Sequence, residues 1–160
     1  MKKSANGNMY EVTLAETWEL FAPYLSGAAS GCVCVVSARP LDDAARGALE
    51  SSAAALGYGR PGCTYAVLRG EDGEGAALDG QALFLLVEGL DPLVVIATDG
   101  ESAAALAVAY RQEVALDAAA HLFGRPAVAF ASFAAMLEDA KSKQAAWALL
   151  KKLPKFGASS

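Results

Sequence analysis

The stretch GCVCVVSARP, residues 31–40, is a run rich in β-branched residues between a glycine and a proline. Its apolar residues do not alternate with polar ones, which is typical of a strand buried on both faces. Three similar runs follow at 64–68, 93–98 and 127–131. Strands of this kind belong to parallel sheets covered by helices on both sides. The pattern therefore predicts an α/β fold.

Segments with helical spacing separate these strands. Thr13 and Glu16 form a capping box that predicts a helix over 14–25. Asp79 and Asp99 are predicted N-caps of the helices that follow the second and third strands. Residues 114–126 are predicted to be a linker. The remaining helix boundaries are predicted from start and stop residues, namely Gly57, Gly89, Pro92, Ser142 and Pro154.

Composition limits the class of protein. The 160 residues, 54% hydrophobic, predict one domain over 1–160, with flexible tails at 1–10 and 155–160. The net charge of −5 argues against free nucleic acid as a partner. No apolar run approaches the roughly 18 residues of a membrane helix, and the polar N-terminus does not resemble a signal peptide. We therefore expect a cytoplasmic protein that does not bind membranes.

The cysteines are interpreted as buried reduced thiols. Cys32 and Cys34 alternate within the first strand and are predicted to share one face of it. With Cys63 and the single histidine, His121, they could form a metal site, but their spacing does not support one. We expect no metal and no cofactor.

Polar residues at the strand exits form the candidate site. In open α/β sheets, ligands bind beyond the carboxyl ends of the strands. No phosphate-binding glycine loop and no nucleophile elbow is present, and a triad of Ser132, His121 and Asp99 has no support from spacing. Paired guanidinium groups suit a phosphate or carboxylate, although surface arginines that only close loops are an equal alternative. The candidate ligand-binding residues are Ser37, Arg39, Pro40, Arg69, Thr98 and Ser132.

The order of elements from Cys32 to Leu153 resembles the uracil-DNA glycosylase superfamily. The segment CVVSARPLDDA stands where the family has its Gly-Glu-x-Pro-Gly loop, and its Pro40 matches. Ser132 and Phe133 stand in place of the family's His-Pro, whereas Lys143 and Trp147 match the Lys…Trp helix. The resemblance implies a three-layer α/β/α sandwich around a four-stranded parallel sheet with the order 2-1-3-4.

The same resemblance implies that base excision is lost. Ala66 stands where the family has the Asn that reads uracil, and Ser132 replaces the histidine that stabilises the developing base anion. Asp42 or Asp43 could act on water, although capping the following helix is the favoured interpretation. The family's iron–sulfur cysteine pattern is missing. We therefore assign no catalytic residue and expect a degenerate glycosylase-like domain, a pseudoenzyme that binds a protein partner or helps an assembly. The alternative is a divergent hydrolase acting on a nucleobase, nucleotide or other small anion.

Overall fold

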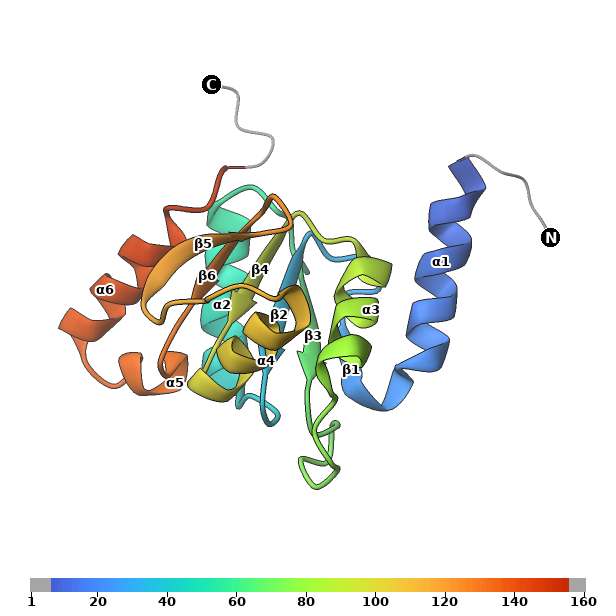
Figure 1. Ribbon diagram of the computed structural model, residues 1–160. Helices are drawn as coiled ribbons and strands as arrows, with labels where there is room; N and C mark the ends of the chain where they lie inside the picture. Colours follow the sequence, from blue (N-terminus) through green and yellow to red (C-terminus); the bar gives the residue numbers. More distant parts are fainter. Residues whose placement is uncertain (1–6, 156–160) are drawn as a thin grey trace.

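The computed structural model describes residues 7–155, with side chains from residue 14 onward. Within this range the chain forms a six-stranded sheet with helices on both faces (Figure 1). The strands are β1 (Leu25–Gly27), β2 (Val33–Ser37), β3 (Cys63–Val67), β4 (Val94–Ala97), β5 (Ala118–Leu122) and β6 (Arg125–Ala129).

The sheet is mixed rather than purely parallel. Its order is β1-β3-β2-β4-β6-β5, with β3, β2, β4 and β6 parallel to one another and an antiparallel strand at each edge. The predicted α/β class is confirmed, and the four predicted strands lie close to their expected positions. A sheet of only four parallel strands in the order 2-1-3-4 is not what the chain forms, because β1 and β5 extend it.

Both additional strands lack a strong sequence signal. Strand β1 is only three residues long, and β5 has the sequence AAAHL, in which alanine favours strands poorly. Strand β5 pairs with β6 through a two-residue turn at Phe123 and Gly124, both of which have positive φ. The prediction of a linker over 114–126 is therefore wrong.

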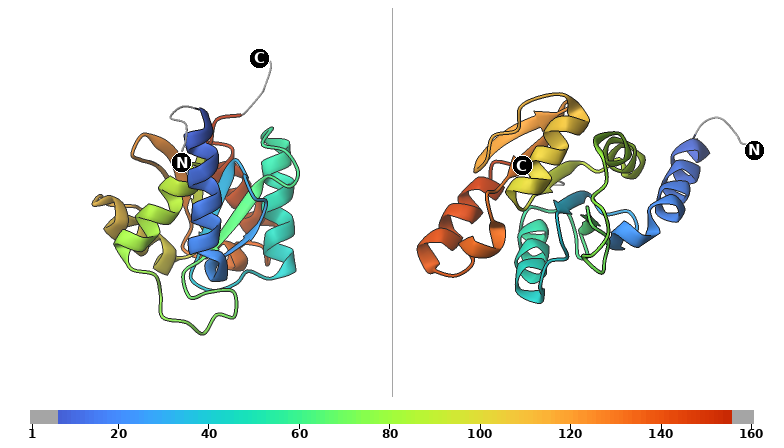
Figure 2. Two further views of the ribbon diagram at one scale, coloured as in Figure 1. Left: turned by 90° about the vertical axis from the view of Figure 1, so that its right-hand side faces the viewer. Right: turned by 60° about the horizontal axis from the view of Figure 1, so that its bottom comes forward.

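Helices cover both faces of the sheet. Helices α1, α3 and α4 lie on one face and α2, α5 and α6 on the other, as the turned views in Figure 2 show. A single 3₁₀ turn, η1 (Ala22–Tyr24), leads from α1 into β1. The helix bounds are α1 (Gly7–Leu20), α2 (Asp43–Ala55), α3 (Gly80–Leu90), α4 (Gly100–Tyr110), α5 (Phe133–Met136) and α6 (Ala140–Leu150).

The predicted caps of the middle helices are confirmed, but the outer helices begin earlier than expected. Asp79 accepts the N–H of Ala82, and Asp99 accepts that of Ser102. Helix α1 begins at Gly7 instead of Leu14, so the predicted cap falls inside it, and the side chain of Thr13 lies outside the described residues. Helix α6 begins at Ala140, two positions before the predicted start at Ser142, because Asp139 is its N-cap. The predicted tails also fall largely outside the described residues, at 1–6 and 156–160.

Two apolar cores, one on each face, hold the layers together. Every residue of β2 is buried, because its alternate side chains enter opposite cores. Cys34 lies in the core beneath α3 and α4, whereas Cys63 lies in the core beneath α2. Cys32 precedes β2 and packs against the α2 side, so the prediction that Cys32 and Cys34 share a face is wrong. Burial raises the pKa of the Cys34 and Cys63 thiols to about 12.

One close helix contact shows why α3 carries a glycine. A Cβ placed on Gly89 would collide with the side chain of Thr17 in α1. The glycine therefore lets α1 lie directly against α3. None of the helices within 7–155 combines the length and apolarity needed to cross a bilayer.

Candidate functional site

Most of the predicted site residues lie at or just beyond the carboxyl ends of the parallel strands. Ser37 ends β2, Thr98 follows β4, and Ser132 follows β6. The chain leaves β2 toward β3 on one side, while β4 leads to β6 on the other. The switch point of the topology, where a ligand crevice is expected, is therefore between β2 and β4.

The carboxylate of Asp99 closes this switch point. Its Oδ2 accepts the backbone N–H of Ala38 at 3.0 Å, which joins the exits of β2 and β4. Its Oδ1 accepts the N–H of Ser102 at 2.7 Å as the cap of α4. A helix N-terminus beside a strand exit is where an anion would bind. Here an anionic side chain of the protein already takes both donors.

The three predicted hydroxyl groups also make internal bonds. Ser37 Oγ donates to the carbonyl of Arg39 at 2.8 Å, and Thr98 Oγ1 donates to the carbonyl of Val36 at 3.3 Å. Ser37 and Thr98 are both buried. Ser132 Oγ accepts the N–H of Ala135 at 3.2 Å, so Ser132 is the N-cap of α5. These hydroxyl groups hold the loops at the strand exits in place.

The two predicted arginines differ in their surroundings. Arg69 Nη2 pairs with Glu101 Oε2 at 2.9 Å, so its charge is balanced from α4. Arg69 Nε is buried and has no hydrogen-bond partner within the described part of the chain. Arg39 and Pro40 are exposed, and no acidic group of residues 14–155 forms an ion pair with Arg39. A hollow of about 380 Å³ is lined by Arg69 and by the acidic residues Glu71 and Asp72, among others.

The residues aligned with glycosylase motifs have structural surroundings. Ala66 is fully buried within β3, and Asp42 is the N-cap of α2. Trp147 is half-buried against the α2-side core, with Lys151 Nζ 5.9 Å from its ring centroid. Asp43 is exposed in the first turn of α2.

His121 cannot complete a triad with Ser132. It pairs with Pro126 near the start of β6, whereas Ser132 lies beyond the end of that strand. Across the residues that the structure describes, no group of three His, Cys, Asp or Glu side chains could hold a metal ion.

A second feature, which we call the aromatic cleft, lies between the start of α3, the end of α4 and the β5–β6 turn. It encloses about 820 Å³. The ring centroids of Phe84 and Tyr110 are 5.1 Å apart, and Phe123 lies 5.7 Å and 6.0 Å from them. The cleft is lined by Asp79, Gly80, Gln81, Phe84, Val108, Ala109, Tyr110, Arg111 and Phe123.

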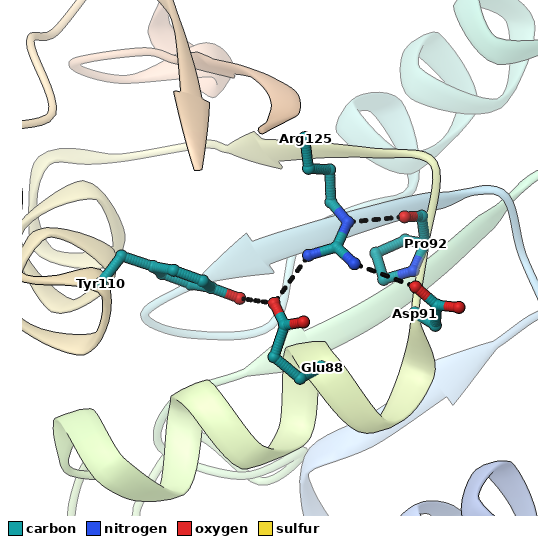
Figure 3. Close-up of polar contacts among 5 residues, drawn as sticks. All are labelled: Glu88, Asp91, Pro92, Tyr110 and Arg125. Atoms are coloured by element: carbon teal, nitrogen blue, oxygen red, sulfur yellow. Dashed lines mark hydrogen bonds and ion pairs between the residues drawn. The ribbon is translucent and has the colours of Figure 1, made fainter. Parts of the chain in front are cut away.

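A polar network behind the cleft fixes one of its walls (Figure 3). The hydroxyl of Tyr110 donates to Glu88 Oε2 at 2.5 Å, and Arg125 Nη1 donates to the same oxygen at 2.7 Å. Arg125 also binds Asp91 Oδ1 at 3.0 Å and the carbonyl of Pro92 at 2.7 Å. Burial, together with the bond to Glu88, raises the pKa of Tyr110.

Sequence reasoning missed the aromatic cleft because its residues come from three separate segments. Phe123 falls in the stretch predicted to be a linker, and Phe84 is one of several apolar residues in α3. The available signal was the Phe-Gly pair between β5 and β6, since a two-residue hairpin turn needs positive φ. Comparison with models of known protein families finds no match to this chain, and no curated protein matches its sequence.

Proposed function

We propose that the protein is a uracil-DNA glycosylase-like α/β domain that does not excise bases and acts as a binding or assembly module. The parallel centre β3-β2-β4-β6 supports the resemblance in fold. Among the described residues, the only histidine is on an edge strand, away from the exits of β2 and β4.

The observation that carries this proposal is the position of Asp99. Its two carboxylate oxygens occupy the N–H donors of Ala38 and Ser102 at the switch point. An incoming phosphate or base anion would need the two N–H donors that the Asp99 carboxylate already occupies. Its negative charge would also be repelled by that carboxylate. The protein's own carboxylate thus takes these two backbone donors at the switch point.

A second candidate is a divergent enzyme or binding protein for a small anion at the same edge. The specific observation in its favour is Arg69 Nε, a buried donor without a partner within residues 14–155. Arg39 is exposed just after the end of β2 and could add a second guanidinium. The pairing of Arg69 with Glu101 weakens this candidate, since part of the positive charge is already balanced.

The experiment is the substitution Asp99→Ser, which keeps a side chain able to cap α4 but removes the carboxylate. Phosphate and adenosine monophosphate are titrated into both proteins and followed by NMR of backbone amides. In the unaltered protein we expect no saturable shifts of the strand-exit amides up to about 10 mM, a concentration at which binding with a Kd of about 1 mM would be detected. Asp99→Ser should gain binding, with the largest shifts at Ala38 and Ser102.

The matched control is Asp139→Ser, the same change at the N-cap of α6, which begins after α5 rather than directly at a strand exit. It should gain no anion binding.

Nucleotide binding by the unaltered protein that disappears in Arg39→Gln and Arg69→Gln would establish the second candidate instead. Excision of uracil from single- or double-stranded DNA by the unaltered protein would refute the proposal.

A further inference from the structure

The aromatic cleft has the dimensions of a small-molecule site. Its volume of about 820 Å³ lies within the roughly 300–1,000 Å³ typical of ligand pockets. Phe84 and Val108 contribute from two helices, and Phe123 contributes from the β5–β6 turn. The rings are tilted or edge-on to one another, so together they offer both ring faces and ring edges to a flat ligand.

Phe123 has two features that are unusual for a bulky residue in a hairpin turn. Its side chain is 75% exposed, and its φ of 57° is in the left-handed region that bulky residues avoid. Asn or Gly ordinarily occupies this position of a two-residue hairpin turn. A backbone held in such a conformation, with an exposed ring at the rim of a cleft, points to a role in binding.

The wall opposite the solvent is preorganised. Tyr110 packs its ring against Phe84 and Phe123, and its hydroxyl is held by Glu88. Glu88 is in turn held by Arg125, and each of the three guanidinium nitrogens donates one hydrogen bond (Figure 3). The network therefore fixes the ring orientation before any ligand arrives, which lowers the entropic cost of binding.

The polar lining of the cleft includes one basic and one acidic side chain, and only the acidic one is bonded within the described part of the fold. Arg111 lines the cleft with φ 55° and forms no ion pair with any residue in 14–155. Asp79, the acidic residue of the lining, directs Oδ1 to the N–H of Ala82 in capping α3. Gln81 adds a neutral amide. A free guanidinium beside aromatic walls matches a ligand that combines a flat ring with a carboxylate.

We propose that the aromatic cleft binds a small molecule that combines a planar aromatic ring with a carboxylate. The ring lies against Phe84, Tyr110 and Phe123, and the carboxylate accepts hydrogen bonds from Arg111. This site is separate from the strand exits, so the outcome of its test does not depend on the function proposed above.

The test uses the full chain and two probes, naphthalene-2-carboxylate and naphthalene-2-carboxamide, which differ only in charge. Binding is measured by calorimetry and by NMR shifts of amides in α3, α4 and the β5–β6 turn. We expect the carboxylate to bind about tenfold more tightly than the carboxamide, because charge-assisted hydrogen bonds are roughly twice as strong as neutral ones. Arg111→Gln should abolish this preference and leave carboxamide binding unchanged.

Phe123→Asn should weaken the binding of both probes at least about tenfold, while the turn folds at least as well because Asn suits positive φ. The matched control is Leu20→Gln, which removes another exposed apolar side chain, 69% exposed in α1, and should leave binding unchanged. Arg39→Gln is the control for loss of an exposed arginine.

Three results would overturn the proposal. The first is the absence of binding by either probe at millimolar concentration. The second is binding that Phe123→Asn does not weaken, or equal affinity for the two probes. The third is a dimer in sedimentation experiments without ligand that becomes a monomer in Phe123→Asn, since the cleft would then accommodate a second copy of the chain.

Discussion

The strand exits and the aromatic cleft differ in how far their side chains are bonded within the fold. At the strand exits, Asp99, Ser37 and Ser132 all bond to nearby backbone groups. In the aromatic cleft, Phe123 is mostly exposed and Arg111 has no ion-pair partner among residues 14–155. Apart from Arg39 and Arg69 Nε, the polar groups at the strand exits are bonded within the fold, whereas the aromatic cleft keeps an exposed ring and a guanidinium that is unpaired in that range.

This difference has a physical origin. Strand exits are crowded and partly buried, and a buried polar group without a partner costs about 1–3 kcal/mol. Polar residues there are selected to bond with one another, so their presence alone does not indicate a ligand. The Phe123 ring contacts Phe84 and Tyr110 at its edge, but most of its surface stays exposed. Unsatisfied features are therefore better indicators of binding than polar composition.

The largest expected effect is on the network behind the aromatic cleft. Arg125→Leu leaves Glu88 and Asp91 without their cationic partner, and Arg125 is only 12% exposed in its side chain. Because Glu88 keeps some solvent contact, we expect a loss of about 3 kcal/mol in the free energy of unfolding, at the lower end for a broken buried pair. Urea denaturation measures it.

The control for this variant comes from the strand exits. Arg39→Leu removes an exposed arginine without an ion-pair partner within residues 14–155, and we expect a change below about 0.5 kcal/mol. Equal losses in the two variants would show that the network does not stabilise the cleft wall.

The buried centre of the fold was the part that the sequence predicted well. Strands β2 and β4 are apolar on both faces, and this pattern has few alternatives in a chain with intervening helices. The caps at Asp79 and Asp99 were also predicted, because a short acidic side chain before an apolar helix has a local role. The edge strands were missed because β1 is short and β5 is mostly alanine.

The site was harder to predict, because side-chain bonding depends on distant segments. The bond between Asp99 and the N–H of Ala38 joins two strand exits that are adjacent only in the folded sheet. Likewise, the pairing of Arg69 with Glu101 could not be read from either residue alone. Residue types at strand ends identify where a crevice would lie, but they do not reveal whether the protein fills it.

A smaller effect, with a pH dependence, is expected at Tyr110. Tyr110→Phe loses the hydrogen bond to Glu88 and should cost about 1 kcal/mol at neutral pH. The folded pKa of Tyr110 is raised by burial and by Glu88, so its stabilising contribution is complete below the unfolded value of about 10 and is lost as the pH rises above it. The difference between the two proteins should therefore shrink by about pH 11. Urea denaturation at both pH values checks this, and a constant difference would contradict the raised pKa.

The smallest expected effect returns to the strand exits, at Ser132. This residue caps α5, accepting the N–H of Ala135 at 3.2 Å, and α5 is a single turn of four residues. Ser132→Ala should therefore cost only about 0.5–1 kcal/mol, and Ser132→Asp should restore that loss because aspartate also caps helices. Thermal and urea denaturation of the three proteins measure it. If Ser132→Ala leaves stability unchanged but alters the binding of phosphate or adenosine monophosphate, the hydroxyl is a ligand contact, and the strand exits are then less completely satisfied than their internal hydrogen bonds indicate.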